Sequence, residues 1–359
     1  MTTTPGLVSV IIPTYNRAHC VGRAIRSALA QTYRDVEVIV VDDGSADATA
    51  HVVAGFDSRV RSLRQANGGV AAARNTGLRA ATGEFIAFLD SDDWWDDWKL
   101  SAQIAVLRAR PDVGMVWTDM RAIDPAGGLR APRYLRTMYT AYDDVDISRV
   151  CRSVALRELW PAAPDPLGAA AVFAGDLCAH MVLGSLVHTS TVVLRRTWAE
   201  QVGEFDATLR VGEDYKYHFA TTALGPVALI DAPSINYLVG AADQLTAPGT
   251  FGLRLARATL ATVTEWCARA PERITLPRRQ VTRRFARLYA WLGSEELLTA
   301  GDRAAARRHL WQSLRRVPGQ PRLIALLLLT LLPAAGLRAL RALKQAWRRR
   351  GSAPVTAHG

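Results

Sequence analysis

Short apolar runs alternate with stretches of helical period along roughly the first third of the chain. The run LVSVIIP, residues 7–13, is rich in Val and Ile and predicts a buried strand. Pro13 is expected to end this strand, because proline has no N–H to donate to a ladder. The next segment, AHCVGRAIRSALAQ, residues 18–31, places apolar residues every three or four positions and predicts a helix.

The same alternation continues to residue 119. Strands are predicted at VEVIVVDD (36–43), near RVRSL (59–63), at EFIAFLD (84–90) and at VGMVWTD (113–119), with a helix through GVAAARNTGLRAA (69–81). Repeated βαβ units build a mostly parallel sheet with helices on its faces. The sequence therefore predicts an α/β fold with a Rossmann-like arrangement.

The pattern changes at about Phe251, where Arg, Ala and Leu become dominant and the period is helical throughout. Residues 251–359 hold 21 Lys and Arg against 5 Asp and Glu, whereas the preceding part holds 23 against 28. We therefore predict an α/β domain over residues 1–250 and a basic α-helical region, built of packed helical hairpins, over residues 251–359. The opposite charges indicate separate roles and a polyanionic partner for the basic region.

Cysteine usage and the N-terminus indicate where the protein works. The four cysteines (Cys20, Cys151, Cys178 and Cys267) are too scattered to give a zinc spacing or a disulfide framework. The N-terminal sequence MTTTPGLVSVIIPTYNR has no basic segment, and its apolar run is too short for a signal peptide. We expect free thiols and a cytoplasmic protein.

Polar residues gather just after three of the predicted strands. They are Thr14, Tyr15 and Asn16 after the first strand, Asp42 and Asp43 after the second, and Asp90 and Asp92 after FIAFL. The carboxyl ends of parallel strands share one edge of a sheet, where phosphorylated ligands bind. Two carboxylates in Asp-x-Asp spacing can hold Mg²⁺ or Mn²⁺ beside a diphosphate. The sequence thus predicts a metal and nucleotide site at this edge.

The acidic run DSDDWWDDW, residues 90–98, has other interpretations. A calcium loop of the EF-hand type is excluded, because a frame that starts at Asp90 puts Trp95 where glycine is required and Ser101 where glutamate is required. A solvated acidic turn remains an alternative. In the same way DDGSAD, residues 42–47, fits a turn with a helix N-cap as well as a ligand site.

Four blocks of the sequence resemble the family 2 inverting glycosyltransferases of GT-A fold. They are VSVIIPTYNR, QTYRDVEVIVVDDGSAD, NGGVAAARNTGLRAATGEFIAFLDSDDWW and GEFDATLRVGEDYKYHFA. The blocks occur in the family's order, which makes them together more specific than any one motif. The resemblance covers roughly residues 7–120 and 188–220 and implies transfer of a sugar from a nucleotide-diphosphate sugar.

On the donor side, the resemblance implies that Pro13 and Tyr15 line the nucleotide base. It implies that Asp43 accepts a hydrogen bond from the base N–H, with Asp42 as the near alternative. Arg74 is expected close to the nucleotide and its phosphates, although a helical arginine is more often a solvated residue.

For the reaction itself, the resemblance implies that Asp90 faces the ribose or a metal-bound water and that Asp92 is a direct ligand of Mn²⁺ or Mg²⁺. Asp214, in GED, matches the general base of the family; a carboxylate at a helix start is also favoured by the helix dipole alone. An inverting enzyme needs a metal to neutralise the leaving group and a carboxylate to deprotonate the acceptor, but no covalent nucleophile.

The acceptor side is less defined. His188, Thr189 and Ser190 lie in LVHTSTVVLRR, where family members place acceptor-side groups, so they are expected to line the acceptor pocket or to bond the backbone. Residues 133–187 match no block and are interpreted as the variable acceptor wall. The expected acceptor is a glycan or a lipid-linked glycan hydroxyl.

The C-terminal stretch indicates contact with a membrane surface. The uncharged run 323–337 has 15 residues, short of the roughly 20 that a spanning helix needs. After it, residues 337–348 form an amphipathic pattern with Leu and Trp on one face and Arg and Lys on another, typical of an interfacial helix. We expect a peripheral association with the inner face of the cell membrane. A helix packed on its own domain is the alternative.

The main rival hypothesis is a nucleic-acid-binding protein that uses the Arg-rich region, in keeping with a sequence pI near 10.0. It is disfavoured because the region lacks zinc-finger spacing and interleaved aromatic residues, and because acids line the strand ends. A nucleotidyltransferase would share the βαβ start and the acids, but would not require the GED block.

Overall fold

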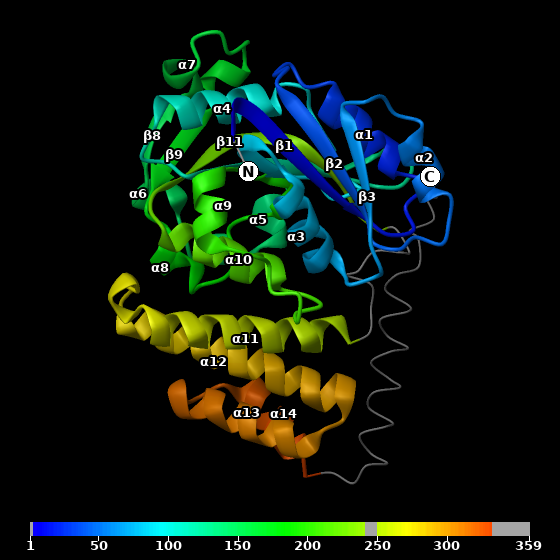
Figure 1. Cartoon of the computed structure of the whole chain (residues 1–359). Coiled ribbons are helices and arrows are strands. Elements are labelled where there is room, and N and C mark those ends of the chain that lie inside the picture. Colours follow the sequence, from blue (N-terminus) through cyan, green and yellow to red (C-terminus); the bar gives the residue numbers. More distant parts are fainter. Residues whose placement is uncertain (1–2, 241–249, 332–359) are drawn as a thin grey trace, which may run out of the picture. The chain divides into compact units, whose positions relative to one another are not determined.

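The computed structural model describes residues 3–240 and 250–331, which divide into two compact units. The first unit comprises Met1–Gln244 and Trp266–Thr275, and the second comprises Leu245–Glu265 and Leu276–Gly359. The first holds a large sheet with helices on its faces, and the second is helical (Figure 1). The predicted α/β fold with a helical C-terminal region is confirmed.

The sheet of the first unit has the strand order β3-β2-β1-β4-β10-β6-β11-β9-β8, while β5 pairs with β11 and β7 with β6. The strands β1 to β4 are parallel, and β6 is parallel to β11. The short β10 is antiparallel to both of its neighbours, β4 and β6. The strands are β1 (Thr4–Thr14), β2 (Val36–Asp42), β3 (Val60–Arg64), β4 (Gly83–Phe88), β5 (Trp94–Trp95), β6 (Met115–Ile123), β7 (Leu129–Ala131), β8 (Arg152–Ala155), β9 (Ala171–Gly175), β10 (Val193–Arg195) and β11 (Val227–Leu238).

The helices of the first unit follow the predicted alternation and add several that the pattern did not indicate. The predicted helices are α1 (Val21–Leu29) and α3 (Val70–Ala80), and α10 (Glu213–Ala223) contains the GED acids. The other helices are α2 (Thr49–Ala54), α4 (Lys99–Ala109), α5 (Leu135–Met138), α6 (Ile147–Val150), α7 (Leu156–Leu159), α8 (Cys178–Met181) and α9 (Arg196–Val202).

The centre of the sheet is dry because β1 and β2 are apolar on both faces. From Val8 to Thr14 every residue of β1 is buried, as expected for a strand covered by helices on both sides. Helix α3 lies so close to β1 that a Cβ on Gly77 would come within 2.3 Å of Ile11 Cγ2. Glycine at position 77 therefore sets the close approach of α3 to the sheet.

The prediction that Pro13 ends the first strand is wrong, because β1 continues to Thr14. Ile11 accepts a hydrogen bond from Leu89 N on the β4 side, and residues two apart in a strand point the same way. The nitrogen of Pro13 therefore points to the β4 side, past Phe88, where β4 has ended. The ladder loses no hydrogen bond at the proline.

The segment 133–187 is more than a wall beside the sheet. Its strand β9 pairs with β11, and β8 pairs with β9, so the segment extends the main sheet at one edge. The remainder consists of short helices and turns.

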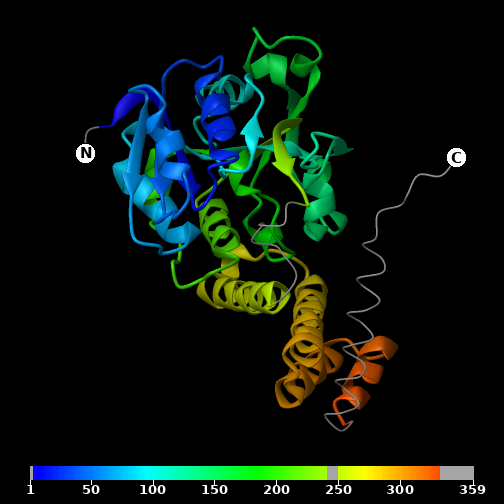
Figure 2. The same ribbon diagram turned by 90° about the vertical axis from the view of Figure 1, so that its right-hand side faces the viewer.

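The second unit is built from helices that pack in pairs. It contains most of α11 (Phe251–Arg269), followed by α12 (Arg278–Glu295), α13 (Arg303–Arg316) and α14 (Pro321–Leu329). Helices α12 and α13 lie side by side, and α13 also packs against α14 (Figure 2). Gly301, with φ of 77°, turns the chain between α12 and α13, and Asp302 caps α13 by accepting from Ala305 N at 2.9 Å. The predicted helical hairpins are confirmed.

Within the described part of the chain, each helix is too short or too polar to cross a bilayer. The uncharged run predicted over residues 323–337 begins inside α14. Residues 332–337 and the amphipathic pattern over residues 337–348 lie outside the described residues.

Candidate active site

The three predicted groups of polar residues lie at the same edge of the sheet, because β1, β2 and β4 are parallel neighbours, and the first two groups are in direct contact. Asp43 N donates to Thr14 O at 2.9 Å, and Asn16 N donates to Ser45 Oγ at 2.9 Å. The end of β1 is thus tied to the turn after β2. Tyr15 projects from this edge with 46% of its surface exposed, while Pro13 is buried in the strand beneath it.

Asp43 anchors the loop that leads into α3. Its Oδ1 accepts from Gln65 Nε2 at 2.8 Å and Gly68 N at 2.9 Å, and its Oδ2 accepts from Gly69 N at 2.7 Å. Its neighbour Asp42 accepts from Ser45 N at 2.8 Å. The buried Oδ2 of Asp42 has no hydrogen-bond partner among the residues that the structure describes. The carboxylate of Asp43 is therefore largely satisfied, whereas Asp42 Oδ2 forms an ion pair with Arg64, whose Nη1 lies 3.7 Å away.

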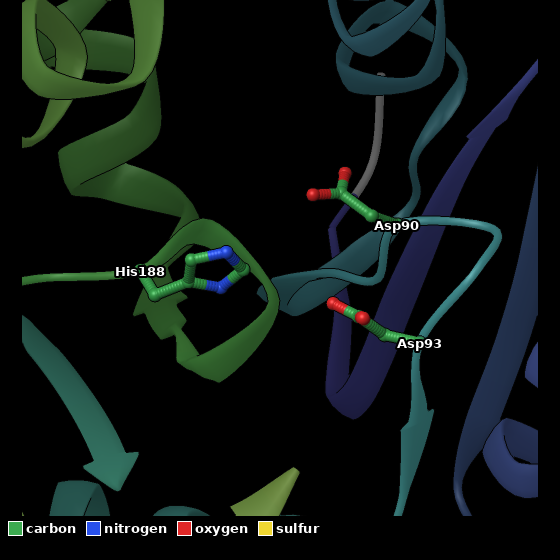
Figure 3. Close-up of side chains that lie close together, drawn as sticks. All are labelled: Asp90, Asp93 and His188. Atoms are coloured by element: carbon green, nitrogen blue, oxygen red, sulfur yellow. The ribbon is translucent and has the colours of Figure 1, made fainter. Parts of the chain in front are cut away.

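The turn after β4 brings a different set of groups together. Asp93 N donates to Asp90 O at 3.1 Å, so the tight turn places these two side chains next to each other. His188 approaches from the loop before β10. One ligand atom from each of Asp90, Asp93 and His188 lies within 4.8 Å of the others, and Figure 3 shows the three side chains around a common space. We call these three residues the acid–histidine cluster.

Backbone contacts hold the two halves of this cluster in place. Ser190 Oγ accepts from Asp90 N at 3.1 Å, and Ser190 O accepts from Trp95 Nε1 at 2.9 Å. The hydroxyl of Thr189 is within 3.2 Å of His218 Nε2. Both hydroxyls predicted to line the acceptor pocket are buried and bonded to the protein. Their evident role is to fix the loop that carries His188.

The acid–histidine cluster has unsatisfied polar atoms and excess negative charge. In the described part of the protein, Asp93 Oδ2 and His188 Nδ1 are buried without a hydrogen-bond partner. Burial, followed by the charges of Asp92 and Asp90, raises the pKa of Asp93 well above its usual value. Burial lowers the pKa of His188, so that its ring is neutral and able to bind a cation. Carboxylate oxygens and a neutral imidazole nitrogen fit a divalent cation such as Mn²⁺.

Asp92, the predicted metal ligand, lies between Asp90 and Asp93 in the sequence but is not a member of the acid–histidine cluster. It is partly exposed, and its backbone oxygen accepts from Arg23 Nη2 at 3.3 Å. The guanidinium of Arg23 lies over the Trp94 ring, 3.5 Å from its centroid. Asp-x-Asp spacing pointed to residues 90 and 92; the observed turn pairs residues 90 and 93 instead. No sequence signal connected them with His188.

Arg74 is a buried bridge between two carboxylates. Its Nη2 donates to Asp90 Oδ1 at 2.7 Å, and its Nη1 donates to Glu213 Oε1 at 2.9 Å. Burial favours a lower pKa for Arg74, but the charges of Asp90 and Glu213 raise its pKa above the usual value. The guanidinium is therefore permanently charged, with both terminal nitrogens bonded to carboxylates and the buried Nε without a partner among the described residues. Arg74 links the turn after β4 to the start of α10.

Glu213 was not singled out from the sequence, although it lies in the GED block. It is buried, and burial together with the charge of Asp214 raises its pKa to about 7, against the opposite influence of Arg74. Asp214 follows in the first turn of α10, where its Oδ1 accepts from its neighbour Tyr215 N at 2.7 Å. Asp214 is partly exposed and is thus the more accessible carboxylate of the two.

Aromatic side chains surround His188. The ring centroids of His188 and Tyr237 are 5.1 Å apart, and those of His188 and Tyr139 are 6.4 Å apart. Tyr134 stacks on Tyr237 at 5.9 Å. Because Tyr134 and Tyr139 come from residues 133–187, this segment borders the acid–histidine cluster.

The match to a known protein family decides what kind of domain carries this site. The model of the family "Glycosyl transferase family 2" matches residues 9–176. The chain carries a family 2 glycosyl transferase domain. The predicted family is confirmed, and the match reaches residue 176 although the motifs had left residues 133–187 without a counterpart.

Curated relatives are similar to parts of this chain. An uncharacterized glycosyltransferase of Nostoc sp. is 42% identical over 113 residues, which are 30% of this chain and 35% of that protein. The Escherichia coli protein WfgD, a UDP-Glc:alpha-D-GlcNAc-diphosphoundecaprenol beta-1,3-glucosyltransferase, is 48% identical over 103 residues, which are 28% of this chain and 41% of WfgD. The alignments with the first four relatives cover 35% to 58% of their lengths.

Among solved structures, residues 1–349 of S. aureus TarS share the fold. The TM-score is 0.58 at 17% identity, with 96% of this chain and 91% of that chain covered. Further structures of the same protein contain UDP or UDP-GlcNAc. The glycosyl transferase domain thus has the predicted GT-A fold.

Proposed function

We propose that the protein transfers a sugar from a nucleoside diphosphate sugar to a hydroxyl group of a glycan or lipid-linked acceptor, by a single inverting displacement. The observation that carries the proposal is the acid–histidine cluster. It has buried unpartnered polar atoms at the ligand-binding edge of a family 2 domain and is linked through Arg74 and Glu213 to the start of α10.

The donor nucleotide would bind beside the turn after β2. The exposed ring of Tyr15 offers a surface for the base, above Pro13. The remaining lone pair of Asp43 can accept from a base N–H, and so can Asp42 Oδ2, which is ion-paired with Arg64 but accepts no hydrogen bond from the described residues. A uridine nucleotide is supported by the UDP-sugar in the name of WfgD and by the UDP-containing structures of TarS.

Asp90, Asp93 and His188 would hold Mn²⁺ or Mg²⁺, with Asp92 as a further predicted ligand. A bound divalent cation neutralises the charge that develops on the diphosphate leaving group. The imidazole in this ligand set favours Mn²⁺ over Mg²⁺, which prefers oxygen ligands. Arg74 keeps Asp90 ionised and oriented for this purpose.

Asp214 would act as the general base. Its carboxylate takes the proton from the acceptor hydroxyl as that oxygen attacks the anomeric carbon. Glu213 and Arg74 fix the first turn of α10, so that the base stays at a set distance from the donor site. The aromatic residues from 133–187 around His188 would form part of the acceptor wall.

A lipid-linked acceptor is supported by WfgD, whose name includes a diphosphoundecaprenol-linked sugar. We propose that residues 1–250 catalyse the transfer at the cytoplasmic face of the membrane. Residues 251–359, which are strongly basic, would have a separate role.

The test is calorimetric titration of the purified full chain with UDP-, GDP- and dTDP-sugars, with and without Mn²⁺. We expect Mn²⁺-dependent binding of one nucleotide class, lost in Asp93→Ala and kept in Asp97→Ala, which removes an exposed carboxylate of the same acidic run. Asp214→Asn should bind the donor normally but lose transfer to a lipid-linked acceptor. Absence of donor binding by the folded protein would refute the proposal, and full transfer by Asp214→Asn would refute the role of the base.

A further inference from the structure

Large apolar side chains are exposed on α13, α14 and the residues that follow α14. Trp311 is 55% exposed, Ile324 44%, Leu328 60% and Leu331 65%. Ile324, Leu328 and Leu331 recur at intervals of four and three residues, so they share one side of the α14 segment. Large apolar side chains exposed together on one side of a helix mark an interaction site.

This surface is not the inner side of a loosely packed helix, because the opposite side of α14 is already packed. Leu323 is buried, and Leu326 and Leu329 pack against a core cluster formed by Leu297 and Ala306. Helix α14, with the sequence PRLIALLLL, is therefore apolar on both sides but uses only one side within its unit. A helix that is apolar all round is normally buried on all sides.

Hydrogen bonds at both ends hold α14 against α13. Arg307 Nε donates to Thr330 Oγ1 at 3.2 Å, near the C-terminal end of α14. Gln320, at its N-terminal end, donates through Nε2 to Ser313 Oγ at 3.3 Å and to Val317 O at 2.7 Å. The exposed side of α14 is thus a fixed feature of the helical pair.

The charged residues of α13, of α14 and of the segment between them have a single sign. Residues 303–331 contain six arginines and no aspartate or glutamate. On α13, Arg308 and Arg315 are exposed and lie three residues before and four residues after Trp311, so the three side chains share one side of the helix. An occupant of this surface must therefore combine an apolar region with negative charge.

We propose that these side chains form a membrane-docking face for bilayers that contain anionic lipids. The face consists of Arg308, Trp311, Arg315, Ile324, Leu328 and Leu331. Leucine and isoleucine side chains enter the boundary between headgroups and acyl chains, tryptophan prefers that interface, and arginines contact lipid phosphates. A second copy of the chain is a poor occupant, since two such faces would bring arginines of like charge together. Nucleic acid would pair with the arginines but leave the leucines without a partner.

The inference goes beyond the proposed transfer reaction. It adds a site in the second unit that would keep the protein at the surface where a lipid-linked acceptor resides. Its test does not depend on catalysis. The membrane-docking proposal can therefore fail while the proposed transfer reaction stands, and the transfer reaction can fail while membrane docking stands.

The experiment is flotation of the full chain with phosphatidylcholine vesicles and with vesicles that contain roughly one third phosphatidylglycerol, at low and high salt. Ile324→Gln/Leu328→Gln should weaken binding to the anionic vesicles at least about tenfold. Arg308→Gln/Arg315→Gln should weaken it about thirtyfold at low salt, because each basic residue near an anionic surface strengthens binding roughly fivefold and the two factors multiply.

Leu129→Gln is the matched control, because Leu129 is 57% exposed on β7, which belongs to the first unit. The control should bind vesicles like the unmodified chain, and all variants should keep its melting temperature, since every altered side chain is exposed. Vesicle binding within twofold of the unmodified chain in both double variants would overturn the proposal. So would a dimer that only the Ile324/Leu328 variant dissociates, or DNA binding as tight as vesicle binding that is lost in the arginine variant.

Discussion

Two acidic turns lie at the same edge of the sheet, yet they are satisfied in different ways. In the turn after β2, Asp43 accepts three hydrogen bonds, two of them from the backbone N–H groups of Gly68 and Gly69. In the turn after β4, Asp93 accepts one long bond, from Leu238 N at 3.3 Å, and its other oxygen has no partner among the described residues. The hydrogen bonds of the Asp43 carboxylate are largely complete within the protein, and those of the Asp93 carboxylate are not.

The comparison teaches that position at a sheet edge does not by itself make an acid a ligand site. A buried carboxylate whose hydrogen bonds are complete stabilises the loop that supplies the donors. A buried carboxylate with an open oxygen, next to a second acid and a neutral histidine, gains from a bound cation.

Removal of a carboxylate from the turn after β4 should have the largest effect. Asp92→Ala and Asp93→Ala should each lower kcat/KM for sugar transfer at least about a thousandfold, because each removes a predicted metal ligand. Asp97→Ala, in the same acidic run, should stay within about twofold. Full activity in Asp92→Ala would remove that residue from the ligand set and leave the acid–histidine cluster alone. Full activity in Asp93→Ala would remove the contrast between the two turns.

Arg74→Gln should lower the free energy of unfolding by about 3–5 kcal/mol, because it leaves Asp90 and Glu213 without their shared cation. Arg79→Gln is the control on the same helix; its side chain is 58% exposed and pairs with Glu204. This control should cost about 1 kcal/mol or less. Urea unfolding measures both. Equal costs would show that the buried bridge does not support the site.

Asp43→Asn should lower the free energy of unfolding by about 1–3 kcal/mol, because an amide nitrogen would face backbone N–H groups that now donate to the carboxylate. Asp57→Asn is a suitable control, since Asp57 is 53% exposed. Donor affinity measured on the same samples separates two roles of Asp43. A loss of affinity without a loss of stability would show a ligand contact rather than a loop anchor.

A buried histidine should make stability fall in acid. Burial lowers the pKa of His218 to about 3, below its value of about 6.5 in the unfolded chain. Between these values the unfolded chain binds a proton that the folded chain does not, so this stability is present above pH 6.5 and is lost as the pH falls. The loss is about 1.4 kcal/mol per pH unit.

His218→Gln should remove this part of the pH dependence, and His51→Gln, at an exposed position, should keep it. Chemical unfolding of the three proteins at several pH values between about 4 and 7 gives the slopes. Identical slopes for the unmodified chain and His218→Gln would contradict the prediction.

Much of the first unit follows from local pattern. The strands β1, β2, β3, β4 and β6 and the helices α1 and α3 all occur where apolar periodicity predicted them, with small shifts at the ends. The predicted end of β1 at Pro13 is one residue early. A proline costs a ladder hydrogen bond only where a neighbouring strand faces its nitrogen, and the sequence does not show whether one does. The pattern did not predict α4 because two polar residues lie on the buried side of this helix. Lys99 is buried in its first turn and donates to Gln103, and Gln103 in turn donates to backbone carbonyls.

Local sequence is enough to predict the alternation of strands and helices, the acidic edge, the basic C-terminal region and the family. These features depend on residues close together in the chain, where spacing and side-chain type carry the information. The fold alone brings His188 to Asp90 and Asp93, joins Asp90 to Glu213 through Arg74, and supplies the hydrogen bonds that satisfy Asp43. Those contacts span up to 139 residues, and their geometry is set by the strand order and by loops whose hydrogen bonds no periodicity reveals.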